Sequence, residues 1–164
     1  MAASSTPTYR FGDLLALARQ SWITQMAAEL ADGGYPDYRR SDAAAVRLLG
    51  RGPMPVGRLG DALGVTRQAA RKVVTGLERR GFAAVHRDPR DARQLNVALT
   101  ADGHAYARAV TAVIDHLNRA LVRRVTPDQL AAADTVLRAV LADGHTRTLA
   151  SYLPPPHEPT GTPD

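Results

Sequence analysis

The sequence predicts a mainly α-helical chain with one small β-hairpin, an arrangement of the α+β class. Apolar residues recur at helical spacing in six stretches along the chain. Between the fourth and the fifth of these, two short strand-like segments, 82–87 and 93–99, flank the turn-forming sequence Asp-Pro-Arg-Asp-Ala. With 164 residues, 45% of them hydrophobic, the chain suits one compact domain or two small lobes that share a core.

The first helix is expected over residues 9–31, followed by a link that reaches residue 40. Its apolar residues keep helical spacing up to an Asp-Gly-Gly sequence. They are Phe11, Leu14, Leu15, Ala18, Trp22, Met26 and Leu30. The two ends of the chain are rich in Pro, Ser and Thr and have little to bury. We therefore expect a disordered N-terminus over residues 1–8 and a flexible tail over residues 143–164.

The next two helices are expected to be short. Ser41 is predicted to cap the first of them, which carries a compact set of apolar residues and ends at Gly-Arg-Gly-Pro. The other follows at residues 55–63, where Leu59, Ala62 and Leu63 line one side.

The fourth helix, over residues 66–80, is joined to the third by a very short turn. Gly64 can adopt the positive φ that a sharp turn demands, and Val65 is expected to fill the corner. Thr66 is a preferred residue type at a helix start and is predicted to cap the fourth helix. A short helix, a glycine turn and a second capped helix are typical of a helix-turn-helix motif.

The charges on this fourth helix are strongly one-sided. It carries five cations and a single acid, Glu78. The apolar residues Ala70, Val73, Val74 and Leu77 form a stripe, and the opposite side presents Gln68, Lys72, Thr75 and Arg79, with Arg71 on its flank. Glutamine can pair with adenine, and arginine or lysine with guanine, in a major groove wide enough for a helix. The alternative interpretation is a solvated cationic face on an ordinary helix.

The hairpin that follows the helix-turn-helix is predicted to be a basic wing. Arg90 stands in its loop and Arg93 opens its second strand, so both could reach phosphates or the minor groove. His86 is expected to contact phosphate, and Asp91 to brace the loop. A plain surface hairpin, in which Asp88 and Asp91 pair with neighbouring arginines, is the alternative. Four residues are expected to face the core: Val85, Leu95, Val97 and Leu99.

Two long helices over residues 100–142 complete the predicted fold. Thr100 is predicted to cap the first. Thr126 and Gln129 have the spacing of a capping box around a proline at the first helical position, which predicts the start of the second. The long helices at the two ends of the fold carry more apolar surface than a small winged lobe can cover. We therefore expect them to pack against a second copy of the chain.

At this point the sequence resembles the MarR family of bacterial winged-helix regulators. The resemblance rests on LGVTRQAARKVVTGLERRGF and DPRDARQLNVALTADG, and the family's element order matches from about Tyr9 to Leu141. The family's wing signature appears as Asp91, Arg93, Val97-Ala98-Leu99-Thr100 and Gly103. Ala92 departs from the pattern, because members often have a second arginine there, and this leaves Arg90 as the expected DNA contact of the wing.

The resemblance implies a homodimer that binds a pseudo-palindromic operator in double-stranded DNA, here predicted to act as a repressor. It divides the chain into an N-terminal dimerisation helix and link over residues 9–40, a winged helix-turn-helix DNA-binding lobe over 41–99, and C-terminal dimerisation helices over 100–142. The fourth helix, 66–80, would be the recognition helix and enter the major groove, and the wing, 82–99, would lie at the minor groove or backbone. The predicted DNA contacts are Thr66, Arg67, Gln68, Arg71, Lys72, Thr75, His86, Arg90 and Arg93.

Release by a small aromatic or phenolic effector is a further implication, since ligands of the family often lie between the first two helices and the DNA-binding lobe. The residues predicted to contact such a ligand are Trp22, Met26, Tyr35, Tyr38 and Arg39. Their aromatic rings could stack on a planar compound, and the arginine could pair with a carboxylate. The alternative is that Trp22 and Met26 are ordinary core residues. A DNA-binding or architectural protein without a ligand switch is the main alternative function.

Other classes of function find little support in the sequence. The absence of cysteine excludes disulfides, thiolate zinc sites and thiol redox sensing. The five histidines show no metal-ligand spacing, so no metal and no cofactor is predicted. No catalytic or nucleotide-binding motif occurs, and the protein is predicted not to be an enzyme, with a hydrolase as a remote alternative. Without an apolar run of membrane-spanning length or an export signal, we expect a cytoplasmic protein without a membrane partner. A net charge of +5 fits a partner that is a polyanion.

Overall fold

A computed structural model describes residues 10–87 and 95–142 of the chain. The described part contains six helices and three short strands. In chain order they are α1 (Phe11–Asp32), α2 (Asp42–Leu49), β1 (Met54–Pro55), α3 (Val56–Leu63), α4 (Arg67–Arg79), β2 (Ala83–Arg87), β3 (Leu95–Leu99), α5 (Ala101–Val122) and α6 (Pro127–Ala142). The predicted mainly helical class with a small antiparallel sheet is confirmed.

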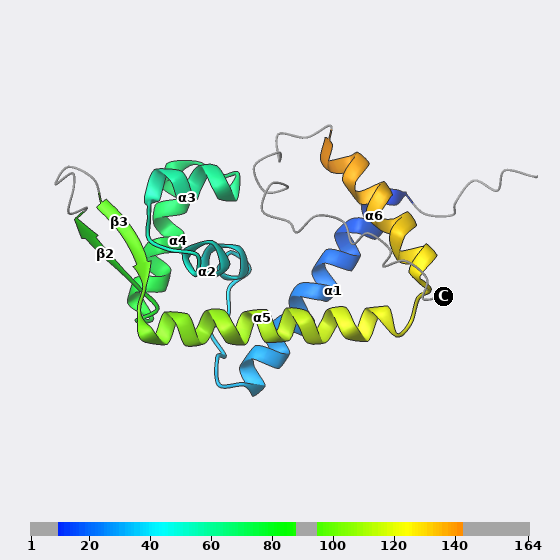
Figure 1. Ribbon diagram of the computed structural model, residues 1–164, viewed down its shortest axis with the longest axis horizontal. Helices are drawn as coiled ribbons and strands as arrows, with labels where there is room; N and C mark the ends of the chain where they lie inside the picture. Colours follow the sequence, from blue (N-terminus) through cyan, green and yellow to red (C-terminus); the bar gives the residue numbers. More distant parts are fainter. Residues whose placement is uncertain (1–9, 88–94, 143–164) are drawn as a thin grey trace, which may run out of the picture.

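The elements form a lobe at one end of a long helix. Figure 1 shows α2, α3, α4 and the strands grouped at the start of α5, whereas α6 lies at the other end of the molecule together with part of α1. The helix α5 runs along the length of the molecule and contacts both α1 and α2. It therefore joins the lobe to the helices at the two ends of the fold. Within the described residues, no helix is both long enough and apolar enough to cross a membrane.

The two helices of the helix-turn-helix pack closely. Gly64 ends α3 in the left-handed conformation, with φ 66°, as its place in the turn predicts. Val65 does not fill the corner, because its side chain is 41% exposed. The backbone itself fills that space: a Cβ on Gly60 would lie only 3.3 Å from both the Ala70 Cβ and the Val65 carbonyl oxygen. A side chain at position 60 would therefore make unusually tight contacts, and its neighbours would have to shift to admit it.

Local hydrogen bonds begin α4, α5 and α6 as predicted. The hydroxyl of Thr66 accepts from the backbone N–H of Ala69 at 3.2 Å, and that of Thr100 accepts from Gly103 at 3.0 Å. Thr126 and Gln129 form the predicted reciprocal capping box, with distances of 2.9 and 3.3 Å.

The predicted cap at Ser41 is wrong. Its side chain makes no capping hydrogen bond, and its backbone is already helical. The carboxylate of Asp42 instead accepts from the backbone N–H of Arg39 at 3.0 Å, while the N–H of Asp42 donates to the Arg39 carbonyl oxygen at 2.8 Å. The turn therefore begins two residues before Ser41, because a charged carboxylate is a stronger acceptor than a serine hydroxyl.

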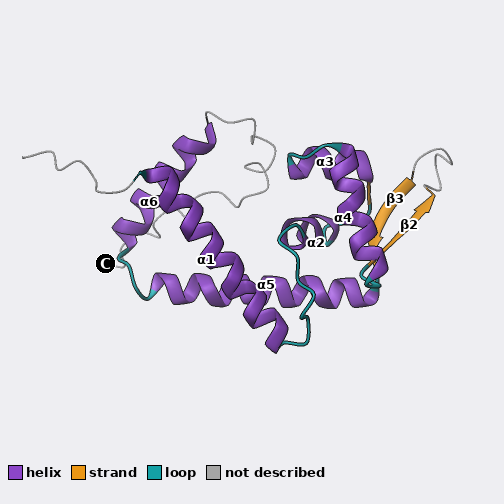
Figure 2. Cartoon of the chain, turned by 180° about the vertical axis from the view of Figure 1, so that it is seen from behind, coloured by secondary structure: helices purple, strands orange, loops and turns teal. Residues whose placement is uncertain are grey.

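The three strands form an antiparallel sheet with β3 in the centre. The register pairs Val85 of β2 and Met54 of β1 with Val97 of β3, and Val97 is fully buried. The two-residue strand β1 was not predicted, because such a short segment has no periodicity. Leu95 is 48% exposed, so its predicted place in the core is wrong. It stands at the outer end of β3, where Figure 2 shows the hairpin projecting beyond the helices of the lobe.

Candidate nucleic-acid interface

The recognition helix α4 turns its apolar stripe inward and its polar side outward. Ala70, Val74 and Leu77 are each at most 2% exposed, as the predicted stripe requires. This packing fixes the rotation of the helix about its own axis. The predicted DNA contacts on this helix and its cap are all exposed; they are Thr66, Arg67, Gln68, Arg71, Lys72 and Thr75.

A shallow groove of about 410 Å³ runs along this outer side and is called the α4 groove below. It is lined by Arg39, Gln68, Arg71, Lys72, Thr75, Gly76 and Arg79. Four of these seven residues are cations and none is an acid, so the groove favours an anionic partner. Arg39 comes from the link between α1 and α2 and was predicted to contact an effector, whereas the structure places it beside the recognition helix.

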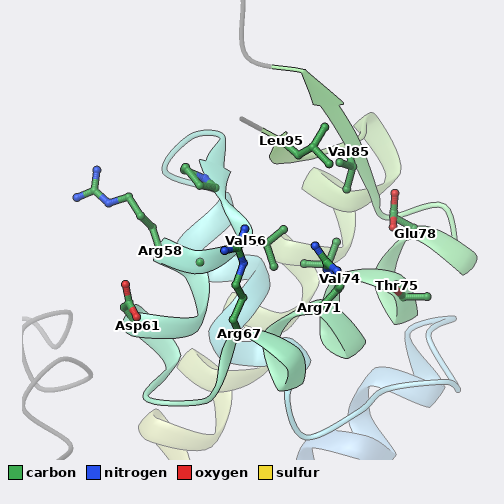
Figure 3. Close-up of a pocket in the computed structure, with 12 residues that line it drawn as sticks. Val56, Arg58, Asp61, Arg67, Arg71, Val74, Thr75, Glu78, Val85 and Leu95 are labelled. Carbon is green, nitrogen blue, oxygen red and sulfur yellow. The ribbon is translucent and has the colours of Figure 1, made fainter. Parts of the chain in front are cut away.

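A larger cleft of about 860 Å³ separates α4 from the sheet and is called the wing cleft below. In Figure 3 the side chains of Arg67 and Arg71 extend from α4 into this cleft, and Val85 and Leu95 border it from the hairpin. Arg58 of α3 lines the same cleft but extends away from its centre. Sequence reasoning missed Arg58, although a cation on the helix before a recognition helix is a usable signal.

The wing is only partly within the described residues. His86 lies on β2, where it is exposed and opposite Asn96. Contact of His86 with a phosphate stays a prediction. The predicted contacts Arg90 and Arg93 and the predicted brace Asp91 lie outside the described residues.

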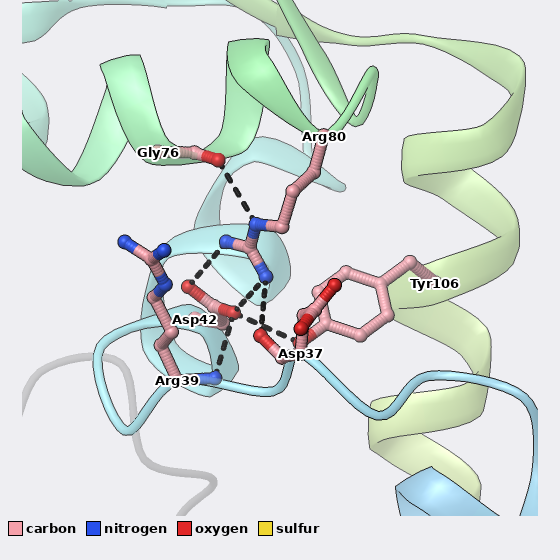
Figure 4. Close-up of polar contacts among 6 residues, drawn as sticks. All are labelled: Asp37, Arg39, Asp42, Gly76, Arg80 and Tyr106. Atoms are coloured by element: carbon pink, nitrogen blue, oxygen red, sulfur yellow. Dashed lines mark hydrogen bonds and ion pairs between the residues drawn. The ribbon is translucent and has the colours of Figure 1, made fainter.

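Arg80, which follows α4 directly, does not belong to this outer face. It is one of the five cations of the predicted helix over residues 66–80, which were expected to face an anionic partner. Its guanidinium instead turns inward (Figure 4). It donates to both carboxylate oxygens of Asp42, at 2.8 and 3.1 Å, and to the carbonyl oxygens of Gly76 and Asp37, each at 2.9 Å. Its side chain is 13% exposed. The external cationic face is therefore smaller by one charge.

Asp42 is the centre of this network, at 1% exposure. Besides the two hydrogen bonds from Arg80 it accepts one from the Tyr106 hydroxyl, at 2.9 Å, and one from the backbone N–H of Arg39. The rings of Phe82 and Tyr106 stack with centroids 4.4 Å apart, and the Arg80 guanidinium lies 5.3 Å from the Phe82 ring centroid. We call this set the Asp42–Arg80–Tyr106 network.

The network holds its members in defined charge states. Burial and the neighbouring charge of Asp42 raise the pKa of the Tyr106 hydroxyl far above its ordinary value, so it remains a hydrogen-bond donor. Burial by itself would lower the pKa of the Arg80 guanidinium, but the hydrogen bonds and charge of Asp42 outweigh burial and raise it. The network joins the end of α4 to the start of α2 and to α5, and thereby fixes where the recognition helix lies in the lobe.

The predicted effector residues divide into two groups. Met26 is 3% exposed and accepts a hydrogen bond from the Tyr38 hydroxyl at 3.7 Å, while Trp22 packs partly buried against the same core. The centroids of the Tyr35 and Tyr106 rings are 5.0 Å apart. These four residues pack around the core, and the fifth, Arg39, lies in the α4 groove. Contact with an effector stays a prediction for all five.

A further pocket lies between α2 and α5, with a volume of about 520 Å³, and is called the α2–α5 pocket below. Arg47 of α2 and Arg51, which follows α2, border it on one side, and His104, Arg108 and Asp115 of α5 border it on the other. Its lining also includes Val46 and Ala107. The described residues contain no group of three or more His, Asp or Glu side chains that could hold a metal ion.

Comparison with known proteins identifies the arrangement. Residues 37–94, which begin within the link and include α2, the helix-turn-helix and β2, match the model of the MarR family. A crystal structure of a probable transcriptional regulator from Pseudomonas aeruginosa is 26% identical, covering 80% of this chain and 96% of the other, with a TM-score of 0.68. In these residues and in its fold, the chain resembles the MarR family.

Two further solved structures share the fold of this chain. The PcaV transcriptional regulator from Streptomyces coelicolor, in complex with its natural ligand, has a TM-score of 0.70 at 23% identity and covers 87% of this chain and 99% of its own. The S. aureus MepR–DNA complex has a TM-score of 0.73 at 18% identity, with coverages of 83% and 99%. No curated protein matches the sequence. The fold is that of a winged-helix, DNA-binding transcription regulator, and the family and the neighbours described here are regulators rather than enzymes.

Proposed function

We propose that this chain is a homodimeric, sequence-specific transcription regulator of the MarR type that places α4 in the major groove of double-stranded DNA. The observation that carries the proposal is the α4 groove, which is lined by four cations and one glutamine and by no acid. Base-reading and phosphate-binding side chains are thus combined on one rigid helix. The wing would contact the adjacent minor groove or backbone through the predicted Arg90 and Arg93. The repressor role stays a prediction.

Replacing Gln68 with alanine should weaken binding to the cognate operator by about 1–3 kcal/mol and relax the preference at one base step. Gln68 is exposed in the first turn of α4, the part of a recognition helix that contacts base edges. The operator is first obtained by selecting bound fragments from genomic or random DNA, and affinities are then measured by fluorescence anisotropy.

A scrambled duplex of the same length is the control for this variant. Binding to it should barely change, because the substitution removes no charge. Equal losses on operator and scrambled DNA would show that Gln68 does not read bases.

Two apolar surfaces support the homodimer. Every side chain of α1 from Phe11 to Ser21 is exposed, and no described side chain of α6 is buried. Large apolar residues stand out on both helices: Phe11, Leu14, Leu15 and Leu17 on α1, and Leu130, Val136, Leu137 and Val140 on α6. Helical segments without buried contacts are marginal in water, so we infer that a second copy of the chain covers them.

Sedimentation at micromolar concentration should therefore give twice the chain mass of 17.6 kDa. The operator should contain inverted half-sites about 10 base pairs apart between centres, because two recognition helices related by a two-fold axis enter successive major grooves. A monomer in sedimentation, or a footprint over one asymmetric half-site, would contradict the dimer.

We also propose that a small aromatic or phenolic acid controls DNA binding. PcaV is a relative in fold that was solved with its natural ligand. In this chain the α2–α5 pocket is large enough for such a compound, and Arg47 and Arg108 in its lining could pair with a carboxylate. Thermal melting against a panel of aromatic acids and phenols, with DNA release measured in parallel, tests this. A compound that binds without changing DNA affinity would favour the ligand-independent alternative, since a ligand shifts only an equilibrium between states that it binds differently.

A further inference from the structure

The recognition helix shares its outer groove with a residue from a distant part of the chain. Arg39 belongs to the link between α1 and α2, yet it lines the α4 groove together with Gln68, Lys72 and Arg79. A Cβ on Gly76 would lie 3.4 Å from the Arg39 guanidinium, so the side chain lies directly on the surface of α4. In Figure 4 it extends from the link toward Gly76.

The backbone of Arg39 is held in place by the Asp42–Arg80–Tyr106 network. Its N–H donates to the Asp42 carboxylate at 3.0 Å, and its carbonyl oxygen accepts from the Asp42 N–H at 2.8 Å. Arg80 and Tyr106 anchor the same carboxylate from α4 and α5. A long cationic side chain thus starts from a fixed point beside the recognition helix, which lowers the entropy cost of holding it there.

Nothing among the described residues neutralises the Arg39 side chain. It is exposed, and no described acid lies within ion-pair distance of its guanidinium. The glycine at position 76 is buried, although it is on the side of α4 that carries the exposed polar residues. The Arg39 side chain covers it. An arginine without an acid partner, packed along a cationic helix, is suited to an external anion.

We propose that Arg39 is a DNA-backbone contact, which extends the interface of α4 to the link between α1 and α2; this rests on the proposed function. Its position beside α4 favours contact with a phosphate rather than with a base. Arg39 lies beside Gly76 and Arg79, near the end of α4, whereas the first turn of a recognition helix contacts base edges. Backbone contacts of this kind set affinity and orientation without reading sequence.

The test compares Arg39→Ala with Arg40→Ala on a fluorescein-labelled duplex of 30 base pairs and random sequence, over a series of salt concentrations. Arg40 is the adjacent residue, which is also an exposed arginine, and it does not line the α4 groove. Arg39→Ala should weaken binding several-fold and lower the slope of log affinity against log salt by about one for each chain bound. Arg40→Ala should leave the slope unchanged, and Arg39→Lys should restore most of it, because the phosphate contact needs a cation.

Each outcome decides the proposal. An unchanged slope for Arg39→Ala, or equal losses for Arg39→Ala and Arg40→Ala, would overturn it. A lower salt slope for Arg39→Ala that Arg39→Lys restores would support the proposal. This holds even if Arg39→Ala melts at a lower temperature, because loss of packing by the arginine stem would not change the dependence of DNA affinity on salt. Failure of the unmodified protein to bind either this duplex or selected genomic DNA would instead overturn the proposed function.

Discussion

Replacing Asp42 with alanine is expected to lower the free energy of unfolding by about 3–5 kcal/mol, because it leaves the Arg80 guanidinium buried without a counter-charge. Asp42 is 1% exposed and accepts hydrogen bonds from Arg80, Tyr106 and the backbone of Arg39. All of these donors would lose their acceptor at once. The melting temperature in a calorimetric scan should fall by at least about 6 °C.

Two comparisons make this prediction sharp. Asp134 forms an ion pair with Arg138 at 2.6 Å on the surface of α6. The Asp134 side chain is 47% exposed and that of Arg138 is 39% exposed. Asp134→Ala should therefore cost at most about 1 kcal/mol, since water screens exposed pairs.

Combining Asp42→Ala with Arg80→Met removes the unpaired charge and should recover part of the lost stability. A double variant less stable than Asp42→Ala would show that Arg80 stabilises the lobe mainly through its other contacts.

Replacing Gly103 with alanine is expected to destabilise the lobe by about 3 kcal/mol or more, which is at the upper end of the overpacking range. A Cβ at this position would overlap the carbonyl oxygen of Phe82 and lie 2.8 Å from its carbonyl carbon. That same oxygen accepts from the N–H of Thr100 at 3.1 Å, and the Thr100 hydroxyl donates to Gly81 at 2.6 Å. Relief of the overlap would require α5 to move away from the segment between α4 and β2, with loss of these hydrogen bonds.

Gly57 of α3 provides the matched control. It is also in a helix, but a Cβ there would meet nothing within 4 Å. Gly57→Ala should therefore stabilise the protein, by about 0.5–1 kcal/mol, through the higher helix propensity of alanine. Denaturant unfolding of the two variants should give changes of opposite sign. Similar small changes at both positions would show that the contact between Gly103 and Phe82 relaxes without cost.

The position of Gly103 also explains one residue of the wing signature. Gly103 belongs to the wing signature on which the resemblance to the MarR family rests, but the sequence alone gives no reason for a glycine in the first turn of a long helix. The reason is the approach of another backbone segment, 21 residues earlier in the chain. The glycine allows α5 to begin directly against the end of the recognition segment, so its role is to position the lobe rather than to contact DNA.

Much of the interface could be predicted from the sequence because its causes are local. Apolar spacing determined which side of α4 is buried, and with it the exposed positions of Gln68 and Lys72. Hydrogen bonds that close within three residues placed the helix starts at Thr66 and Thr126, and one glycine with positive φ formed the turn. A residue and its partner in such contacts are nearly adjacent in the chain, so the spacing of residue types is sufficient to recognise them.

The tertiary structure alone decided where the remaining charges point. Arg79 and Arg80 are neighbours at the end of the same cationic run, yet Arg79 lines the α4 groove while Arg80 is held inward by Asp42, 38 residues earlier. Tyr106 reaches the same carboxylate across 64 residues of sequence. The link carries Arg39 to the surface of α4 in the same way. A local pattern cannot specify these partners, because it fixes which side of a helix is polar but not which distant carboxylate or backbone segment packs against that side.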